Sequence, residues 1–127
     1  MKHIREADIE GVRAPKPHAR TLKHLLSPWR DGSMRVWVGL SNIDPRSSSN
    51  RHRHDDKEEV FYVVSGSGEM VVGYEREAIQ VGSLILVPPG SEHQLVNDND
   101  EALTVLSVVS PPFNPSEFDL QHSISGT

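Results

Sequence analysis

Short runs of alternating apolar and polar residues recur along the chain, and this two-residue period is the feature that most constrains the fold. Successive side chains of a strand point to opposite faces, so each run predicts a strand with one buried face. The predicted strands are 21–26, 34–40, 59–64, 69–74, 84–87, 93–96 and 103–109. Little of the remaining sequence favours a helix, and we therefore expect an all-β protein, an antiparallel sandwich or barrel.

The strand predicted at 34–40 shows how its two faces are assigned. Alternation predicts an inward face that carries Met34, Val36, Val38 and Leu40. Trp37 then falls on the opposite face, where we expect it either to pack between the sheets or to contact a second subunit. The residues expected to line the interior of the barrel are Met34, Val36, Val38, Phe61, Val63 and Leu95.

The length of the chain, 127 residues, predicts a single domain over residues 1–127. Residues 1–20 and 111–127 hold most of the irregular, proline-containing sequence, and we expect them to wrap the barrel or to reach a second subunit. A net charge of −5 argues against nucleic acid and anionic membranes as partners, because both attract basic surfaces. The first residues are charged and no long apolar segment follows, which predicts a cytoplasmic protein.

The chain contains no cysteine, which excludes disulfides, thiolate metal sites and cysteine nucleophiles. Any metal ion would have to be held by histidine, aspartate or glutamate. Seven histidines are available. Those that lie outside the motifs described next, and that we expect at the surface, are His3, His18, His24 and His122.

The segment 51–66 contains the most informative group of titratable residues. On an extended chain, His52 and His54 point to the same side about 7 Å apart, close enough to share an ion. Strand alternation separates Glu58 from Glu59 but does not show which of the two faces inward. The alternative interpretation is a solvated charged loop, because the two histidines stand among arginine, aspartate and lysine residues.

A second segment, 82–97, has the pattern of a strand, a Pro-Pro-Gly turn and a strand that carries His93. Together, the two segments resemble the two conserved motifs of the cupin superfamily. The second motif is matched at each defined position, by Gly82, Pro88, Gly90, His93 and Asn97. The first motif, over 46–66, is matched by His52, His54, Glu59 and Gly66. Its six-residue gap before Gly66 selects Glu59 over Glu58, and Arg46 stands where the family has a glycine.

The resemblance implies a cupin-type double-stranded β-helix, which is a jelly-roll-like antiparallel barrel, in a single domain. It also implies one divalent transition metal ion (Fe, Mn, Ni, Co, Cu or Zn). The implied ligands are His52, His54, Glu59 and His93. Four protein ligands would leave two positions of a six-coordinate ion open to water, substrate or dioxygen.

These features predict a protein that uses the ion to act on, or to bind, a small oxygen-bearing molecule. The expected reaction is either a dioxygenation or a redox-neutral isomerisation, decarboxylation or lyase step, with no catalytic side chain identified beyond the metal ligands. The alternative is a non-catalytic cupin in which the metal is structural or anchors the ligand. By analogy with the family we expect a homodimer that associates through exposed strand edges or the terminal segments.

Overall fold

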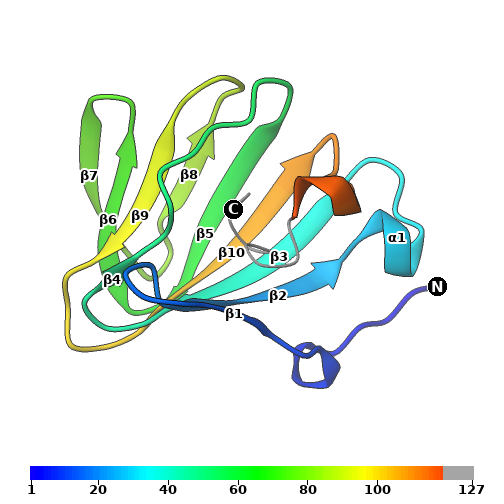
Figure 1. The fold of residues 1–127 in the computed structure, drawn as a ribbon, viewed down its shortest axis with the longest axis horizontal. Coiled ribbons are helices and arrows are strands. Elements are labelled where there is room, and N and C mark those ends of the chain that lie inside the picture. The colour runs from blue at the N-terminus through cyan, green and yellow to red at the C-terminus, as the bar shows by residue number, and fades with distance from the viewer. Residues whose placement is uncertain (119–127) are drawn as a thin grey trace.

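A computed structural model describes residues 1–118 of the chain. Within them, strands dominate and only short helical turns accompany them, as expected for an all-β protein (Figure 1). The strands are β1 Val12–Ala14, β2 Arg20–Leu26, β3 Trp37–Ile43, β4 Ser47–Ser48, β5 Glu58–Ser65, β6 Ser67–Val72, β7 Glu75–Gln80, β8 Leu84–Val87, β9 His93–Asn97 and β10 Leu103–Ser110. The helical segments are η1 Glu6–Asp8, α1 Pro28–Asp31 and η2 Pro115–Glu117. None of the helices within residues 1–118 has the length and apolar character needed to cross a membrane.

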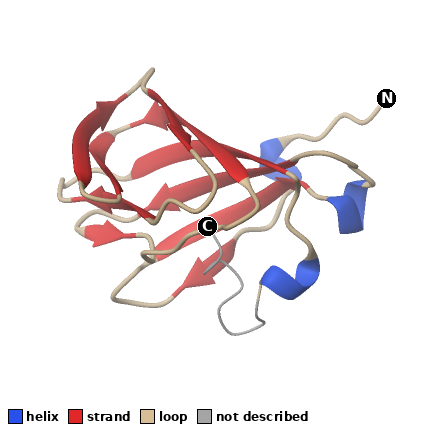
Figure 2. Ribbon diagram, turned by 90° about the horizontal axis from the view of Figure 1, so that it is seen from above, coloured by secondary structure: helices blue, strands red, loops and turns tan. Residues whose placement is uncertain are grey.

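The strands form two antiparallel sheets that face each other as the layers of a sandwich (Figure 2). The larger sheet has the order β1-β2-β3-β10-β5-β8, and the smaller one has the order β4-β9-β6-β7. The chain passes from β8 in the larger sheet to β9 in the smaller sheet and back to β10 in the larger one. This exchange between layers is the jelly-roll arrangement that the resemblance of the two motifs implies.

The main hydrophobic core lies between the two sheets, where every second residue of a strand points inward. Its buried members are Ile43, Phe61, Val63, Met70, Ile79, Val87, Leu95, Leu103 and Val105. Three of them, Phe61, Val63 and Leu95, are predicted correctly as interior residues. The alternation in β5 and β9 therefore identifies the core-facing side of both strands that enter the functional site.

The predicted inward face of 34–40 is wrong. Strand β3 begins at Trp37, which is fully buried, whereas Met34 is 83% exposed and Val36 and Val38 are only partly buried. The indole of Trp37 joins a second core cluster with Leu22, Val109 and Phe113. Room for it exists because Gly39 has no side chain: a Cβ there would lie 2.1 Å from the ring. Of the two roles expected for Trp37, core packing is confirmed.

The described parts of the terminal segments pack on the body of the protein. Strand β1 pairs with β2 at the edge of the larger sheet. Near the other end, Phe113 and Phe118 lie against the ring of Trp37, with ring centroids 4.9 and 6.0 Å away. Residues 119–127, and with them His122, lie outside the described residues. Contact of either terminus with a second subunit stays a prediction.

Two of the histidines expected at the surface are partly buried instead. Nδ1 of His24 accepts a hydrogen bond of 3.1 Å from Nε1 of Trp37, and its ring packs against Trp29 and Phe118. Burial lowers the pKa of His24 to about 4, and the charge of Arg30 adds to this effect. His18 lies 3.0 Å from the hydroxyl of Ser48, measured from its Nδ1 atom. His3 is exposed, as predicted.

Candidate metal centre

The structure brings together all four residues of the implied ligand set. Each of His52, His54, Glu59 and His93 offers one ligand atom, and these atoms all lie within 4.8 Å of one another. His52 and His54 lie in the segment before β5, Glu59 lies in β5 of the larger sheet, and His93 begins β9 of the smaller sheet. The cluster therefore lies between the two layers of the sandwich.

Backbone pairing sets the separation of two of these histidines. The amide of His52 donates to the carbonyl of His93 at 3.1 Å, and the amide of His93 donates to the carbonyl of His52 at 2.8 Å. Directly opposed residues of an antiparallel pair project to the same face, and the two imidazole centroids lie only 4.4 Å apart. A residue pair that is far apart in sequence is thus held together by two main-chain hydrogen bonds.

The same two imidazoles are oriented through their Nδ1 atoms. Nδ1 of His52 lies 2.7 Å from the carbonyl oxygen of Asn50, and Nδ1 of His93 lies 3.0 Å from that of Ser91. Because a carbonyl oxygen only accepts hydrogen bonds, both Nδ1 atoms must carry the proton, which leaves a lone pair on each Nε2. Both Nε2 atoms are buried and have no hydrogen-bond partner among residues 1–118. This is how a metal-binding histidine is typically held.

The carboxylate of Glu59 is buried beside these nitrogens, with only 1% of the residue exposed. Its Oε1 atom lies 3.3 Å from Nε2 of His93 and 3.7 Å from Nε2 of His54, and Oε2 accepts a hydrogen bond from the hydroxyl of Ser107. Burial raises the pKa of Glu59, although His93 and Ser107 oppose this shift. The lone pairs of this carboxylate and of the imidazole nitrogens point toward one place that no hydrogen-bond donor among residues 1–118 occupies, and such a place suits a cation.

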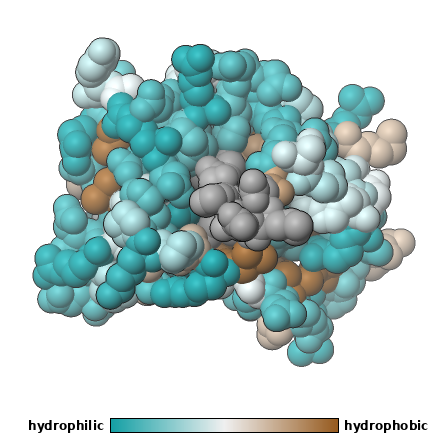
Figure 3. Space-filling model, in the orientation of Figure 1, coloured by the Kyte–Doolittle hydropathy of each residue, from teal (hydrophilic) through white to brown (hydrophobic). Residues whose placement is uncertain are grey.

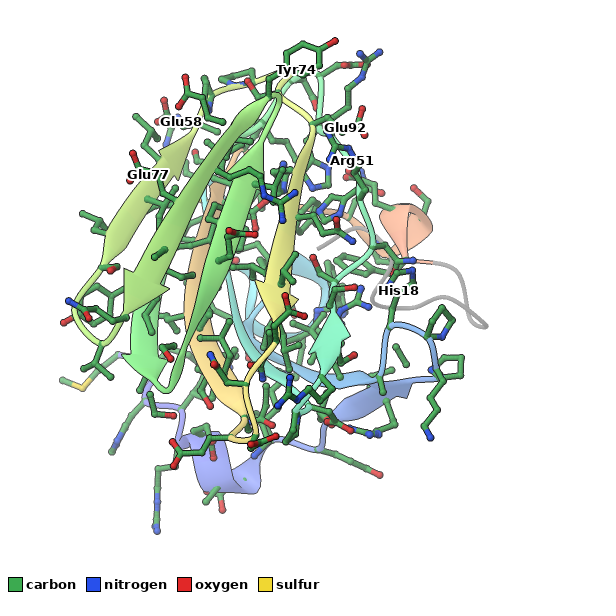
Figure 4. All side chains as sticks on the ribbon, turned by 90° about the vertical axis from the view of Figure 1, so that its left-hand side faces the viewer. His18, Arg51, Glu58, Tyr74, Glu77 and Glu92 are labelled. Atoms are coloured by element: carbon green, nitrogen blue, oxygen red, sulfur yellow. The ribbon has the colours of Figure 1, made fainter. Side chains whose placement is uncertain are left out.

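The choice between the two adjacent glutamates is now resolved by burial. Glu59 shares the inward face of β5 with Phe61, whereas Glu58 is exposed. Figure 4 shows Glu58 well apart from Arg51 and Glu92, the neighbours of His52 and His93 in sequence. The solvated-loop interpretation is wrong for the histidines, because the Nε2 atoms of His52 and His54 are buried. Arg51 and Arg53 beside them are exposed, whereas Lys57 is buried.

The surroundings of the cluster keep His52 neutral. Burial lowers the pKa of His52 to about 3, and the nearby His93 adds to this shift. Aromatic rings contribute to this environment: Phe61 lies 5.8 Å from the ring of His93, and Phe113 lies 4.8 Å from that of His54. Neutral imidazole is the form that binds metal ions, so the folded protein holds His52 in its ligand form at neutral pH.

Contacts just outside the cluster fasten the two motif segments together. Arg51 forms an ion pair with Glu92 and donates a hydrogen bond of 3.0 Å from Nη2 to the carbonyl of Gly73. Figure 4 shows Arg51 and Glu92 side by side, with Tyr74 towards the same end of the molecule. These exposed contacts join the residues that directly precede His52 and His93.

Arg20 is a neighbour of the site that the sequence analysis does not identify. It is 1% exposed, and its Nη2 atom donates to Oδ1 of Asn50 at 2.9 Å. Asn50 is also the residue whose carbonyl oxygen faces Nδ1 of His52. Burial lowers the pKa of Arg20 to about 10, so the guanidinium stays charged at neutral pH. No local pattern signals this role, because Arg20 lies in β2, far in sequence from both motifs.

Other motif positions shape the turns rather than the cluster. Arg46, at the position where the family has glycine, adopts a left-handed backbone with φ of 58°, so the turn is kept at some steric cost. Its side chain pairs with Asp100 at 2.8 Å. The side-chain amide of Asn97 donates to the carbonyl oxygens of Ile43, Asp44 and Glu101, which ties the turn after β9 to the end of β3.

A separate cavity of about 340 Å³ lies at the open seam between the edge strands β7 and β8. Its lining residues are Met70, Val72, Glu75, Glu77, Leu84, Ile85, Leu86 and Pro88. None of the four clustered residues lines this cavity, so we do not assign it to the candidate metal centre.

The fold and the cluster together define a jelly-roll protein with a buried site of three histidines and one glutamate. Residues 39–109, more than half of the chain, match the family model for the cupin domain, and the chain belongs to this family. The resemblance read from the two motifs is thereby confirmed.

Individual relatives place the chain more closely. It is 33% identical over 112 residues to an uncharacterised protein of Streptomyces coelicolor, covering 88% of this chain and 98% of the relative. Its structure is similar to that of the polyketide cyclase RemF from Streptomyces resistomycificus, with a TM-score of 0.75, 27% identity, and 87% and 79% of the two chains covered. It is also similar to a predicted oxalate decarboxylase from Thermotoga maritima, with a TM-score of 0.78, 21% identity, and 86% and 98% covered. The latter similarity shows the fold alone.

Proposed function

We propose that this cupin binds one divalent transition metal ion through His52, His54, Glu59 and His93, and that it acts on a small oxygen-bearing molecule bound at the ion. The observation that carries the proposal is the convergence of four ligand atoms within 4.8 Å. Two of the imidazoles are held in the tautomer that directs a lone pair inward. Three imidazoles and one carboxylate suit Fe, Mn, Co, Ni, Cu or Zn, whereas Ca²⁺ prefers oxygen ligands.

When bound, such an ion would polarise a carbonyl or carboxylate oxygen of the substrate. The chain supplies the conditions for this. Ser107 orients the carboxylate of Glu59, and the carbonyls of Asn50 and Ser91 orient the imidazoles of His52 and His93. The adjacent rings of Phe61 and Phe113 lower the local polarity, which strengthens electrostatic interactions at the centre.

Among the reactions that this site supports, we favour a redox-neutral reaction of a carbonyl compound. The similarity to a polyketide cyclase, at 27% identity over most of both chains, supports this choice. Polyketides are rich in carbonyl oxygens, and closing a ring by condensation changes no net oxidation state. Dioxygenation and ligand binding without turnover are the alternatives that the experiment must separate. The cytoplasmic location stays a prediction.

The test begins with protein stripped by a chelator and reloaded separately with Fe(II), Mn(II), Co(II), Ni(II) or Zn(II). We expect about one ion per chain by elemental analysis, and loss of binding in His93→Ala. Loaded protein is then offered β-diketones, β-keto acids and catechols in an oxygen electrode. Product formed without oxygen uptake supports the proposed reaction, and oxygen uptake indicates a dioxygenase. Thermal stabilisation by a compound that is never converted indicates a binding protein. Failure of the wild-type chain to retain any metal would overturn the proposal.

A further inference from the structure

The two sheets of the sandwich each end in a strand that has a free edge. β7 is the last strand of the smaller sheet and β8 is the last strand of the larger one, and within residues 1–118 each pairs with one strand only. The cavity of about 340 Å³ lies between these two strands, and we call the cavity and the two free edges the β7–β8 seam. In Figure 3, hydrophobic residues interrupt the mainly hydrophilic surface at the end of the molecule that carries β6 and β7. A free strand edge beside an apolar cavity is a place where another chain can add.

The walls of the β7–β8 seam continue the hydrophobic core. Met70 belongs to the main core cluster, and Val72 of β6 and Ile85 of β8 pack against it. Leu84 and Leu86 complete the wall on the side of β8, and they are 68% and 57% exposed. The core therefore opens to solvent along this seam, and burial of its apolar walls would favour the binding of a partner.

Two carboxylates face the same cavity. Glu75 and Glu77 alternate with the buried Ile79 in β7, so they lie on the side of the strand that faces the other sheet, and both line the cavity. Neither forms an ion pair with a residue of the described chain. Arg76 stands between them in sequence, but it lies on the opposite face of the strand and pairs with Glu69. The cavity thus combines apolar walls with a negative charge that suits a cationic side chain.

The charged residues at the nearby end of β5 do not neutralise this seam. Glu58 is exposed at the start of β5, the strand that pairs with β8, and it adds a further carboxylate. Figure 4 shows Glu58 and Glu77 towards the same side of the molecule. Lys57, directly before Glu58, is only 5% exposed; it donates a hydrogen bond of 3.2 Å to the carbonyl of Pro112 and lies 3.4 Å from Glu117.

The backbone of β8 presents hydrogen-bonding groups to the same seam. The amide of Val63 donates to the carbonyl of Ser83 at 3.0 Å, which fixes the residues of this ladder that bond to β5. In an antiparallel ladder these residues alternate with residues whose N–H and C=O groups point the other way. Positions 83, 85 and 87 thus bond to β5, and the backbone groups of Leu84 and Leu86 point to the free edge. An extended peptide can pair with such groups as an added strand.

We propose that the β7–β8 seam binds an extended segment of another protein in which apolar and basic residues alternate, added antiparallel to β8. A strand paired with Leu84 and Leu86 points every second side chain into the cavity and the others outward. An inward lysine or arginine places its aliphatic stem against the apolar walls and its charge near Glu75 and Glu77. The outward apolar residues cover the two leucines. No residue of the metal cluster lines the cavity, so this inference goes beyond the proposed function.

The probe for the test is a fluorescein-labelled peptide of about nine residues in which valine and lysine alternate, with both ends capped. Its binding to the full chain is measured by fluorescence anisotropy. We expect saturable binding that weakens several-fold between about 20 and 200 mM NaCl, because the ion pairs at the seam are partly exposed. A peptide of the same composition with valines and lysines in separate blocks should bind roughly tenfold more weakly, and so should one with glutamate in place of lysine.

Variants of the protein separate the seam from the overall charge of the chain. Glu75→Gln/Glu77→Gln should weaken binding of the alternating peptide about tenfold, because it removes two ion pairs, each worth up to about fivefold in affinity. Glu10→Gln/Glu101→Gln is the matched control. It makes the same change in net charge at two exposed positions outside the seam, and it should leave the affinity within about twofold.

Methylated peptides test the strand pairing while the protein stays unchanged. In the antiparallel arrangement the valine N–H groups bond to β8 and the lysine N–H groups point away, so methylation of the valine amides should abolish binding and methylation of the lysine amides should leave most of it. Binding that survives methylation of the valine amides would overturn the proposal.

Three other results would also overturn it. The first is a wild-type chain that does not bind the alternating peptide. The second is displacement of the peptide by butylamine at equal concentration, which would assign the cavity to small organic cations. The third is a mass, measured by light scattering, that falls from two chains to one in Leu86→Lys while no peptide binds, which would assign the seam to a second copy of the chain. These measurements require no bound metal, so their failure is distinguishable from failure of the proposed function.

Discussion

Replacing Glu59 by glutamine should have opposite effects on the stability of the protein with and without metal. The carboxylate is 1% exposed, and burial raises its pKa above the value of 4.5 that applies to an exposed glutamate. Between these two pKa values the folded state binds more protons than the unfolded state. The free energy of unfolding therefore falls as the pH rises through this window, and at neutral pH the buried charge costs stability.

The magnitude follows from what the substitution removes. Glutamine has the same size and can still accept a hydrogen bond from Ser107, but it carries no charge. Without metal, removal of this buried charge in Glu59→Gln should raise the free energy of unfolding by about 1–3 kcal/mol. For a domain of this length, each kcal/mol raises the melting temperature by roughly 4 °C. With metal at a hundredfold excess over its Kd, the wild-type chain gains about 2.7 kcal/mol, or roughly 11 °C, and the variant should lose most of this gain.

The assay is thermal unfolding by circular dichroism at pH 7.5, once with chelator and once with added Co(II). Glu58→Gln is the matched control, because Glu58 is adjacent and exposed and should change neither melting temperature by more than a degree or two. The reasoning would be refuted if Glu59→Gln melted below the wild type in chelator, or if it kept the full stabilisation by metal.

Three further outcomes are expected. Arg20→Met should weaken metal binding about tenfold, because Arg20 holds Asn50 beside His52; competition with a chromophoric chelator measures the affinity. The control is Leu22→Ala, a change of a buried residue on the same strand, which should lower stability but leave the metal affinity within about twofold. The pKa of His24 is lowered to about 4 in the folded state, so the unfolded chain binds more protons than the folded chain between pH 6.5 and 4. The free energy of unfolding, measured by denaturant titration, should therefore fall as the pH is lowered through this range. A His24→Gln chain with the same dependence of this free energy on pH would contradict the reasoning. Gly39→Ala should lower the free energy of unfolding in urea by about 1–3 kcal/mol, because the new Cβ would lie 2.1 Å from the indole of Trp37. An unchanged free energy would show that the ring can move aside freely.

Much of the candidate site could be predicted from the sequence because its residues lie in two short segments. The spacing of His52, His54 and Glu59 is a property of one extended segment, and the turn before His93 has a recognisable Pro-Pro-Gly pattern. Alternation also located the strands of the core, since burial of one face leaves a two-residue period. The choice of Glu59 over Glu58 came from motif spacing and agrees with the burial of β5.

The features that the sequence analysis got wrong or missed depend on contacts between distant segments. In 34–40 both faces contain apolar residues, and only the partners of Trp37, which include Leu22 and Val109, decide which face is buried. The same holds for His24, which is partly buried because it accepts a hydrogen bond from that indole. Arg20 approaches the site from β2 of the larger sheet, and no spacing along the chain records this contact.

The paired backbone hydrogen bonds between His52 and His93 also affect how this protein can be altered. The two imidazoles are positioned by pairing across the interior, so the length of the chain between them does not set their separation. The hairpin of β6 and β7 belongs to that intervening chain and ends at Tyr74, which is fully exposed. This tip is tied to both histidine segments, because the carbonyl of Gly73 accepts a hydrogen bond from Arg51 and its backbone amide donates to the carbonyl of Glu92. A peptide tag inserted there should therefore disturb the residues that directly precede His52 and His93. The turn at residues 73–74 is thus part of what holds the two histidine segments in place.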